Sequence, residues 1–226
     1  MDWIDYDQHA RTRDREDFWG QVRRTVRGQA VGPEQIEMIV SAVMRHLELA
    51  PEDHVLDLAC GNGALTALLQ PFCASTLGVD ISPYLIGIAR EHFASARHRF
   101  LEQDAAEYAE SEPDPARFTK ALCYGSLSYL DDEAVRRLLR TLHARFPNVR
   151  RVMLGNLPDP ARAGAFYVAG QSPSLREPRS DIGVWRHAAE LAQLAGPGWH
   201  VQTSRMPASF FAAHYRFDAI LARAPC

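Results

Sequence analysis

Short apolar runs alternate with segments of helical spacing from about residue 50 onward, and this alternation limits the possible fold more than any other feature. Strands that alternate with helices are typical of a parallel sheet covered by helices. The last two apolar runs have no helix between them, so we expect them to pair antiparallel. The sequence therefore predicts an α/β fold with strands at residues 54–59, 76–81, 99–103, 119–124, 151–155, 200–204 and 215–223.

Signals for helix starts follow several of these strands. Residues 64–69 form the expected helix after a glycine turn, and Ser82 with Pro83 suits the N-cap and first position of the next one. Asp131 and Asp132 open a further helix, where acidic side chains interact favourably with the helix dipole.

The remaining connections are expected to be less regular. A polar loop with Pro113 and Pro115 precedes the fourth strand, and a long insertion covers residues 156–183. The helix after this insertion carries apolar residues at helical spacing, namely Val184, Trp185, Ala188, Leu191 and Leu194.

The first fifty residues differ from the rest of the chain. Residues 14–27 are rich in charge, with Phe18, Trp19, Val22 and Val26 expected on one helix face, and Gly32-Pro33 starts a second helix. We therefore expect one domain over residues 1–226, in which a helical cap (1–50) covers an α/β core (51–226) that contains the 156–183 insertion.

Composition narrows the classes of function. The 226 residues carry a formal net charge of −3 with arginines scattered among acids, which argues against a polybasic surface for nucleic acid or anionic membrane. No apolar run reaches the ~18 residues of a membrane span, and the first residues do not resemble a leader, so we expect a cytoplasmic protein. The four cysteines are widely spaced, so no metal site is expected.

Three carboxylates follow three successive strands. Asp57 lies in the first strand before the turn Ala59-Cys60-Gly61-Asn62-Gly63, Asp80 ends the second strand and Asp104 ends the third. Glycines between a strand and a helix let the backbone approach a ligand and offer it N–H groups. An acid at the end of the second strand suits a ribose diol, so the pattern predicts a nucleotide site.

These segments resemble the class I S-adenosylmethionine-dependent methyltransferases. The resemblance rests on the order and spacing of residues 55–63, 77–83 and 103–105. It implies a doubly wound, mostly parallel seven-stranded sheet with an antiparallel last strand, flanked by helices, together with S-adenosylmethionine as cofactor and S-adenosylhomocysteine as product.

The resemblance also implies roles in cofactor binding. Gly61 and Gly63 would lie against the methionine part of the cofactor, with Asp57 near its ammonium group. Asp80 would bind both ribose hydroxyls. Ala59 stands where the family usually has its first glycine.

Further residues would contact the adenine. Ile81 would pack on the ring, Asp104 would bind its amino group, and Ala105 would offer a backbone N–H. Cys123 and Tyr124 would line the cofactor at the end of the fourth strand.

A nicotinamide-dependent dehydrogenase is the alternative within nucleotide-binding folds. Its G-x-G-x-x-G fingerprint requires glycine or alanine at the third position, where this chain has Thr66. Asp57 inside a strand also suits an ammonium group better than a pyrophosphate.

Candidate acceptor-side residues follow strands four and five. They are Tyr124, Ser126, Tyr129, Asp131 and Asn156, because ligands of such sheets lie outside the carboxyl ends of the strands. The segment after strand four lacks an Asn-Pro-Pro-Tyr-like pattern, which favours an oxygen acceptor over a nucleobase amine.

Transfer to a hydroxyl requires a base. We expect Asp131, Tyr124 or His187 as the catalytic residue, while Asp131 is also explained as a helix cap and His187 and His214 as structural histidines.

The insertion and the N-terminus offer a lid for the acceptor. Arg176, Arg179 and Arg186 would hold a phosphate or carboxylate on it, and Tyr6, Phe18 and Trp19 would form the other half. A solvated surface loop explains the insertion equally well.

Three function classes remain open. The favoured one is O-methylation of a sugar-like or secondary-metabolite hydroxyl on a small molecule. The second is nucleic-acid methylation, and the third is a non-catalytic cofactor-binding partner protein. A basic face for nucleic acid would comprise Arg136, Arg137, Arg140, Arg150 and Arg151.

Overall fold

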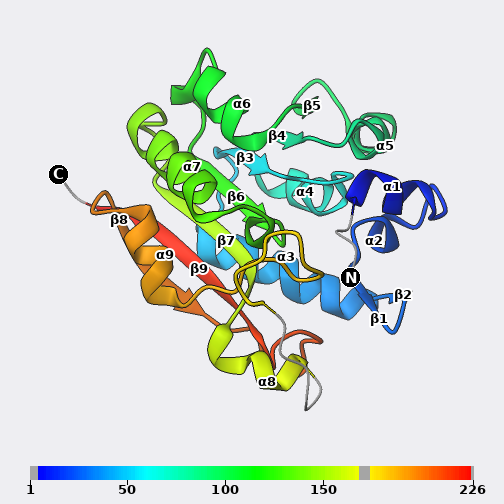
Figure 1. Ribbon diagram of the computed structural model, residues 1–226. Coiled ribbons are helices and arrows are strands. Elements are labelled where there is room, and N and C mark those ends of the chain that lie inside the picture. Colours follow the sequence, from blue (N-terminus) through cyan, green and yellow to red (C-terminus); the bar gives the residue numbers. More distant parts are fainter. Residues whose placement is uncertain (1–4, 168–173, 225–226) are drawn as a thin grey trace.

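The computed structural model describes residues 5–167 and 174–224 and contains a seven-stranded sheet with helices on both faces (Figure 1). The strand order is β5-β4-β3-β6-β7-β9-β8, with β9 antiparallel to both of its neighbours and the other strands parallel to one another. The expected fold class, including the antiparallel last strand, is confirmed. The strands are β3 (His54–Leu58), β4 (Ser75–Asp80), β5 (His98–Glu102), β6 (Lys120–Tyr124), β7 (Arg151–Pro158), β8 (Trp199–Ser204) and β9 (Arg216–Arg223).

The earlier helices of the chain cover one face of the sheet and the later helices cover the other. Apolar side chains of α6 (Ala105–Ser111), α7 (Asp132–Arg145) and α9 (Ala188–Ala195) bury one face, and those of α3 (Pro33–Leu47) and α4 (Ala64–Leu69) bury much of the other. Helix α5 (Pro83–Phe93) packs against β5 through Ile86 and Ala89. Both faces of the sheet are therefore covered by helices. A ligand can reach the sheet only at the ends of its strands.

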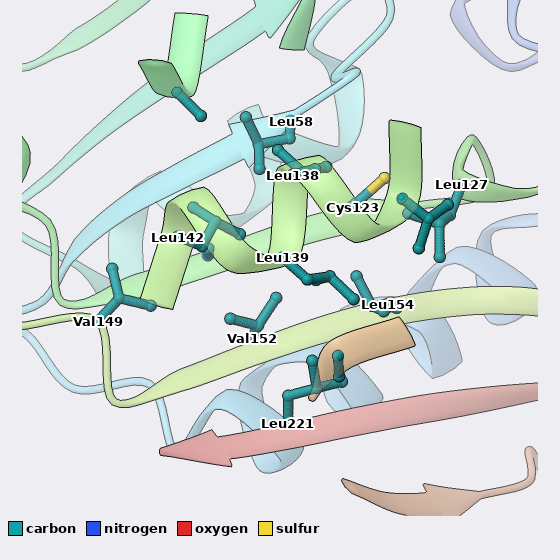
Figure 2. Packing of buried hydrophobic residues seen from close by; sticks show 14 of the residues in the cluster. Leu58, Cys123, Leu127, Leu138, Leu139, Leu142, Val149, Val152, Leu154 and Leu221 are labelled. Carbon is teal, nitrogen blue, oxygen red and sulfur yellow. The ribbon is translucent and has the colours of Figure 1, made fainter. Parts of the chain in front are cut away.

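Helix α7 shows how the core fixes the strands. Leu138, Leu139 and Leu142 are buried and belong to one cluster with Val152 of β7 and Leu221 of β9 (Figure 2). Burying one leucine side chain stabilises the fold by about 2 kcal/mol. This packing fixes α7 against β7 and β9.

Two predicted helix starts are confirmed with their caps. The Ser82 hydroxyl accepts the Leu85 N–H at 3.1 Å at the start of α5. Asp131 Oδ1 accepts the Ala134 N–H at 2.8 Å at the start of α7. Each cap satisfies a backbone donor that has no partner within its helix.

Two connections differ from the prediction. Residues 105–111 form helix α6 rather than a polar loop, because Asp104 Oδ1 accepts the N–H groups of Ala106 and Glu107 and Tyr108 is buried beneath the helix. Helix α9 begins only at Ala188, so the buried Val184 and Trp185 precede it in a segment without regular secondary structure.

The insertion begins later than predicted. Strand β7 continues to Pro158 across an irregularity between Leu154 and Leu157. Asn156 adopts φ +62° there, and its N–H donates to Asp218 Oδ1 at 2.7 Å. The insertion then contains α8 (Ala163–Phe166), and residues 168–173 lie outside the described part.

The N-terminal segment is less helical than predicted. It contains α1 (Tyr6–Arg11), α2 (Phe18–Gln21) and a hairpin of β1 (Thr25–Val26) and β2 (Gln29–Ala30) before α3. Val26 is exposed on the hairpin instead of lying on a helix face. In the described part of the chain, no helix combines the length and the apolar character that a membrane span requires.

Candidate functional site

A cavity of about 610 Å³ lies at the carboxyl ends of the parallel strands. The ends of β3, β4, β5 and β6 line it, as does β7, and β9 contributes its first residue because it runs in the opposite direction. The N-terminal segment, the insertion and the loop before β9 complete the wall. Among the lining residues are Tyr6, Val22, Arg23, Arg24, Ala59, Cys60, Gly61, Asp80, Ile81, Asp104, Ala105, Cys123, Tyr124, Ser126, Tyr129, Asn156, Phe166, Asp181, Ile182, Phe211, Tyr215 and Arg216.

Asp80, at the end of β4, is hydrogen-bonded through its side chain to the glycine turn that follows β3. Its Oδ2 accepts the Gly61 N–H at 2.8 Å and its Oδ1 accepts the Ser82 N–H at 2.9 Å. Burial raises the pKa of Asp80 above its ordinary value, and the two backbone bonds oppose that effect. Because a carboxylate offers about four acceptor positions, Asp80 retains capacity for two hydroxyl groups.

The turn itself has left-handed backbone. Ala59, Gly61 and Gly63 adopt φ values of +56°, +60° and +75°. A Cβ atom at Gly63 would lie 2.6 Å from the Phe100 ring, so packing requires that glycine, and Gly63 does not line the cavity. Ala59 does line it, although left-handed backbone costs an alanine about 1–2 kcal/mol. Such strain is common at ligand sites.

Asp57 lies behind the cavity wall rather than in it. Its Oδ2 accepts the Thr66 hydroxyl at 2.5 Å, and its side chain is buried. Burial raises the pKa of Asp57 to about 7, while the Thr66 hydrogen bond and the charge of Arg24 act in the opposite direction. A cationic group beside it would favour the ionised carboxylate.

The residues that follow β4 and β5 present groups suited to a flat ring. The apolar side chain of Ile81 is 70% exposed at the cavity. Asp104 uses Oδ1 for its helix cap, so its second carboxylate oxygen is available to a ligand, and Ala105 follows it in the wall. A diol acceptor, an exposed apolar surface and a carboxylate in this order fit a nucleoside.

The candidate residues after β6 and β7 separate into two groups. Tyr124, Ser126, Tyr129 and Asn156 line the cavity, as does the buried Cys123. The Tyr129 hydroxyl accepts a hydrogen bond from Tyr6 at 3.0 Å and donates one to the Asp181 carbonyl at 3.0 Å.

Asp131 and His187 belong to the other group, which does not line the cavity. Asp131 is exposed as the cap of α7. His187 is exposed as the cap of α9, with its N–H donating to Glu190. The structure therefore places both at helix ends and not among the residues that line the cavity.

Burial changes the chemistry of the two tyrosines in the wall. It raises the pKa of Tyr124 and of Tyr129 well above the ordinary value. Both phenols therefore stay protonated at neutral pH and act as hydrogen-bond donors rather than as bases.

The arginines expected to bind an anion have other partners. Arg176 pairs with Asp132 at 2.7 Å and with Glu190 at 2.9 Å, and the buried Arg186 pairs with Asp132 at 2.8 Å. Arg179 does not line the cavity.

The expected basic face for nucleic acid is also partly neutralised. Arg136 pairs with Glu133 and Arg137 with Glu110. Arg151 likewise pairs with Glu48.

Of the N-terminal residues that were expected over the site, some line the cavity and others pack elsewhere. Tyr6 lines the cavity, whereas Phe18 packs on His92 and Phe93. Trp19 stacks on Arg24, which lines the cavity and was not anticipated. Arginine is frequent throughout this chain, so no local signal distinguished this one.

Parts of the chain are similar in sequence to known methyltransferases. The profile of the family described as "Methyltransferase domain" matches residues 55–146. A ubiquinone biosynthesis O-methyltransferase of Methylococcus capsulatus is 30% identical over 105 residues, which cover 46% of this chain and 42% of that protein. The 23S rRNA (uracil(1939)-C(5))-methyltransferase RlmD of Klebsiella pneumoniae is 34% identical over 95 residues, or 36% of this chain and 22% of the relative. The chain thus spans less than half the length of either relative.

Solved structures share the fold. Magnesium protoporphyrin IX methyltransferase (ChlM) from Synechocystis PCC 6803, solved with bound S-adenosylhomocysteine, superposes with a TM-score of 0.57 at 20% identity. The match covers 84% of this chain and 82% of that one. The resemblance stated from the sequence motifs is confirmed by these matches: the methyltransferase domain profile matches residues 55–146, and solved methyltransferases share the fold of the chain.

Proposed function

We propose that the protein transfers the methyl group of S-adenosylmethionine to an oxygen atom of a small-molecule acceptor. The observation that carries this proposal is the position of the Asp80 carboxylate, which is fixed by the Gly61 and Ser82 N–H groups and faces the cavity with unused acceptor capacity. The ubiquinone biosynthesis relative supports an oxygen acceptor on a small molecule.

The cofactor would lie along the ends of β3, β4 and β5. Asp80 would bind the ribose hydroxyls, and Ile81 would cover one face of the adenine. Asp104 and the Ala105 N–H would bind the edge of that ring, while Gly61 would approach the methionine part. Asp57 would act on the ammonium group from behind the wall.

The chain's own contribution to methyl transfer is mainly positioning. S-adenosylmethionine supplies an activated methyl group on its sulfonium. Holding the acceptor in line with that group is worth up to ~7–11 kcal/mol. Tyr6 and Tyr129 are hydrogen-bonded to each other and both line the cavity, where they would help to exclude water from the reacting groups.

Because Tyr124 and Tyr129 stay protonated, they can donate hydrogen bonds to the molecule that accepts the methyl group. The protonated Tyr124 hydroxyl would orient an acceptor oxygen by donating a hydrogen bond to it. Asp131 and His187 would not accept a proton from an acceptor in this cavity, since neither lines it. Neither residue is therefore proposed as the base.

A nucleic-acid acceptor is the second candidate, because RlmD is a relative whose name states an rRNA substrate. The acid partners of Arg136, Arg137 and Arg151 weaken that alternative. Steep salt dependence of RNA binding would favour it.

Calorimetric titration with S-adenosylhomocysteine tests the proposal. We expect binding to wild type, a loss of thirtyfold or more in Asp80→Asn, and no loss in Glu102→Gln. Glu102 is a matched control because it is the exposed register partner of Asp80 on β5 and does not line the cavity.

The results of this titration and of an activity screen distinguish the proposed methyltransferase from a protein without this site and from a non-catalytic partner protein. Equal binding by all three proteins, or no binding by folded wild type, contradicts the proposed site. Binding without methyl transfer to any acceptor across a broad panel of hydroxylated and acidic small molecules would support a non-catalytic partner protein instead.

A further inference from the structure

One end of the cavity gathers cationic and aromatic groups around the ends of β6, β7 and β9. Tyr124 ends β6, Asn156 lies in β7, and Arg216 begins β9. Arg24 from the N-terminal segment lies over the Tyr124 ring at 5.3 Å from its centroid. In strand order this end is separated from Asp80, which ends β4, and from Asp104, which follows β5.

Arg24 is held in a defined orientation. Its guanidinium also lies 5.4 Å from the centroid of the Trp19 ring, so two aromatic rings contact it. Burial lowers the pKa of Arg24, and the charge of Asp57 acts in the opposite direction. Arginine remains charged in proteins, so this half-buried cation carries a desolvation cost that a bound anion would offset.

Arg216 is held in a similar way. Its guanidinium lies 4.9 Å from the centroid of the Tyr215 ring, and its Nη1 donates to the Asn156 carbonyl. In the described residues, neither Arg24 nor Arg216 forms an ion pair with a carboxylate. Both line the cavity.

A buried donor at the same end also has no partner. The Tyr124 hydroxyl is buried without a hydrogen-bond partner in the part of the chain that the structure describes. A buried polar group without a hydrogen-bond partner destabilises the protein. Because the phenol stays protonated, it requires an acceptor oxygen.

Apolar side chains surround these polar groups. Phe166 and Tyr215 stack with centroids 4.7 Å apart, and both line the cavity together with Phe211 and Ile182. Phe166 is 37% exposed, so this wall offers apolar surface to a ligand.

We propose that the methyl acceptor is a hydrophobic carboxylic acid. Its carboxylate would be bound by Arg24, Arg216 and the Tyr124 hydroxyl, and its apolar body would pack against Phe166 and Tyr215. Guanidinium groups match a carboxylate geometrically and bind it through charge-assisted hydrogen bonds. This inference rests on the proposed function, since it names the acceptor class of the same cavity.

Matched ligand pairs test the proposal on the full chain saturated with S-adenosylhomocysteine. Benzoate, cinnamate and octanoate are each titrated beside their own primary amides, which have the same body without the charge. We expect the acid of at least one pair to bind ten times more tightly than its amide, and acetate to bind at least ten times more weakly than that acid.

Three variants assign the preference to the proposed residues. Arg24→Gln and Arg216→Gln are expected to reduce the preference for the acid to threefold or less. The control Arg140→Gln, at an exposed arginine outside the cavity, is expected to retain it. If Arg24→Gln does not fold, Tyr124→Phe takes its place, with an expected loss of at least threefold in acid binding.

The contrary results are equally specific. Equal binding of every acid and its amide, or a preference that survives in both arginine variants, overturns the inference. Preferred binding of phenyl phosphate over all three acids overturns the carboxylate assignment. The S-adenosylhomocysteine titration distinguishes the two proposals: its failure defeats the proposed function and this inference with it, whereas cofactor binding without acid preference defeats this inference alone.

Discussion

Replacing Asp57 with asparagine tests the electrostatics of the site most sharply. The pKa of Asp57 is raised from an ordinary 3.8 to about 7 because the carboxyl group is buried. The folded protein therefore keeps this proton up to about pH 7, whereas the unfolded chain releases it near pH 4. The contribution of Asp57 to stability accordingly falls as the pH rises between those two values.

The expected effect follows from that difference. A pKa of about 7 in place of 3.8 corresponds to about 4 kcal/mol for the ionised form. Asparagine is nearly isosteric, carries no charge and keeps an oxygen for the Thr66 hydroxyl. We expect Asp57→Asn to exceed wild type in free energy of unfolding by about 1–4 kcal/mol at pH 8, and by much less at pH 5.

Urea unfolding followed by circular dichroism at pH 5, 6, 7 and 8 measures this difference. Glu102→Gln serves as the control, because its carboxyl group is exposed and its difference from wild type is expected to vary little with pH. A difference between Asp57→Asn and wild type that is constant with pH, or a less stable variant at pH 8, would refute the reasoning.

The same carboxylate links pH to ligand binding. A cationic ammonium near Asp57 favours its ionised form, so wild type is expected to bind S-adenosylhomocysteine more tightly as the pH rises through 7. Asp57→Asn is expected to bind more weakly at pH 8 and to lose this dependence. Calorimetry at pH 6 and pH 8 separates this result from a general loss of affinity.

Three further predictions follow from the same geometry. Ala59→Gly relieves the left-handed backbone and is expected to raise the free energy of unfolding by up to about 1 kcal/mol in a urea titration; a loss would contradict the strain. Asp131→Ala removes a helix cap and is expected to cost about 1 kcal/mol while S-adenosylhomocysteine binding stays unchanged; weaker binding would return Asp131 to the site. Tryptic cleavage after Arg11 and Arg15 is expected to slow when S-adenosylhomocysteine binds, and identical digestion rates would argue against an N-terminal cover.

The part of the fold that local chemistry determines was predictable. Asp80 follows a buried strand and precedes the Ser82 cap, so both its place at the strand end and the start of α5 follow from neighbouring residues. Asp104 was correctly placed after a strand, yet its role as the cap of α6 was missed because the alanines after it suggested no helix face.

The other wall of the cavity depends on long-range packing. Tyr6 and Tyr129 are 123 positions apart, and Arg24 contacts Tyr124 across a similar separation. No local pattern encodes such pairs. Asp131 and His187 carried suitable chemistry, but both cap helices and neither lines the cavity.

A crystal structure of the protein grown with S-adenosylhomocysteine tests the central claim most directly. We expect the ribose hydroxyls within hydrogen-bonding distance of the Asp80 carboxylate, the adenine against Ile81 and its amino group near Asp104. A ligand bound elsewhere, or a ribose that does not contact Asp80, would contradict the account.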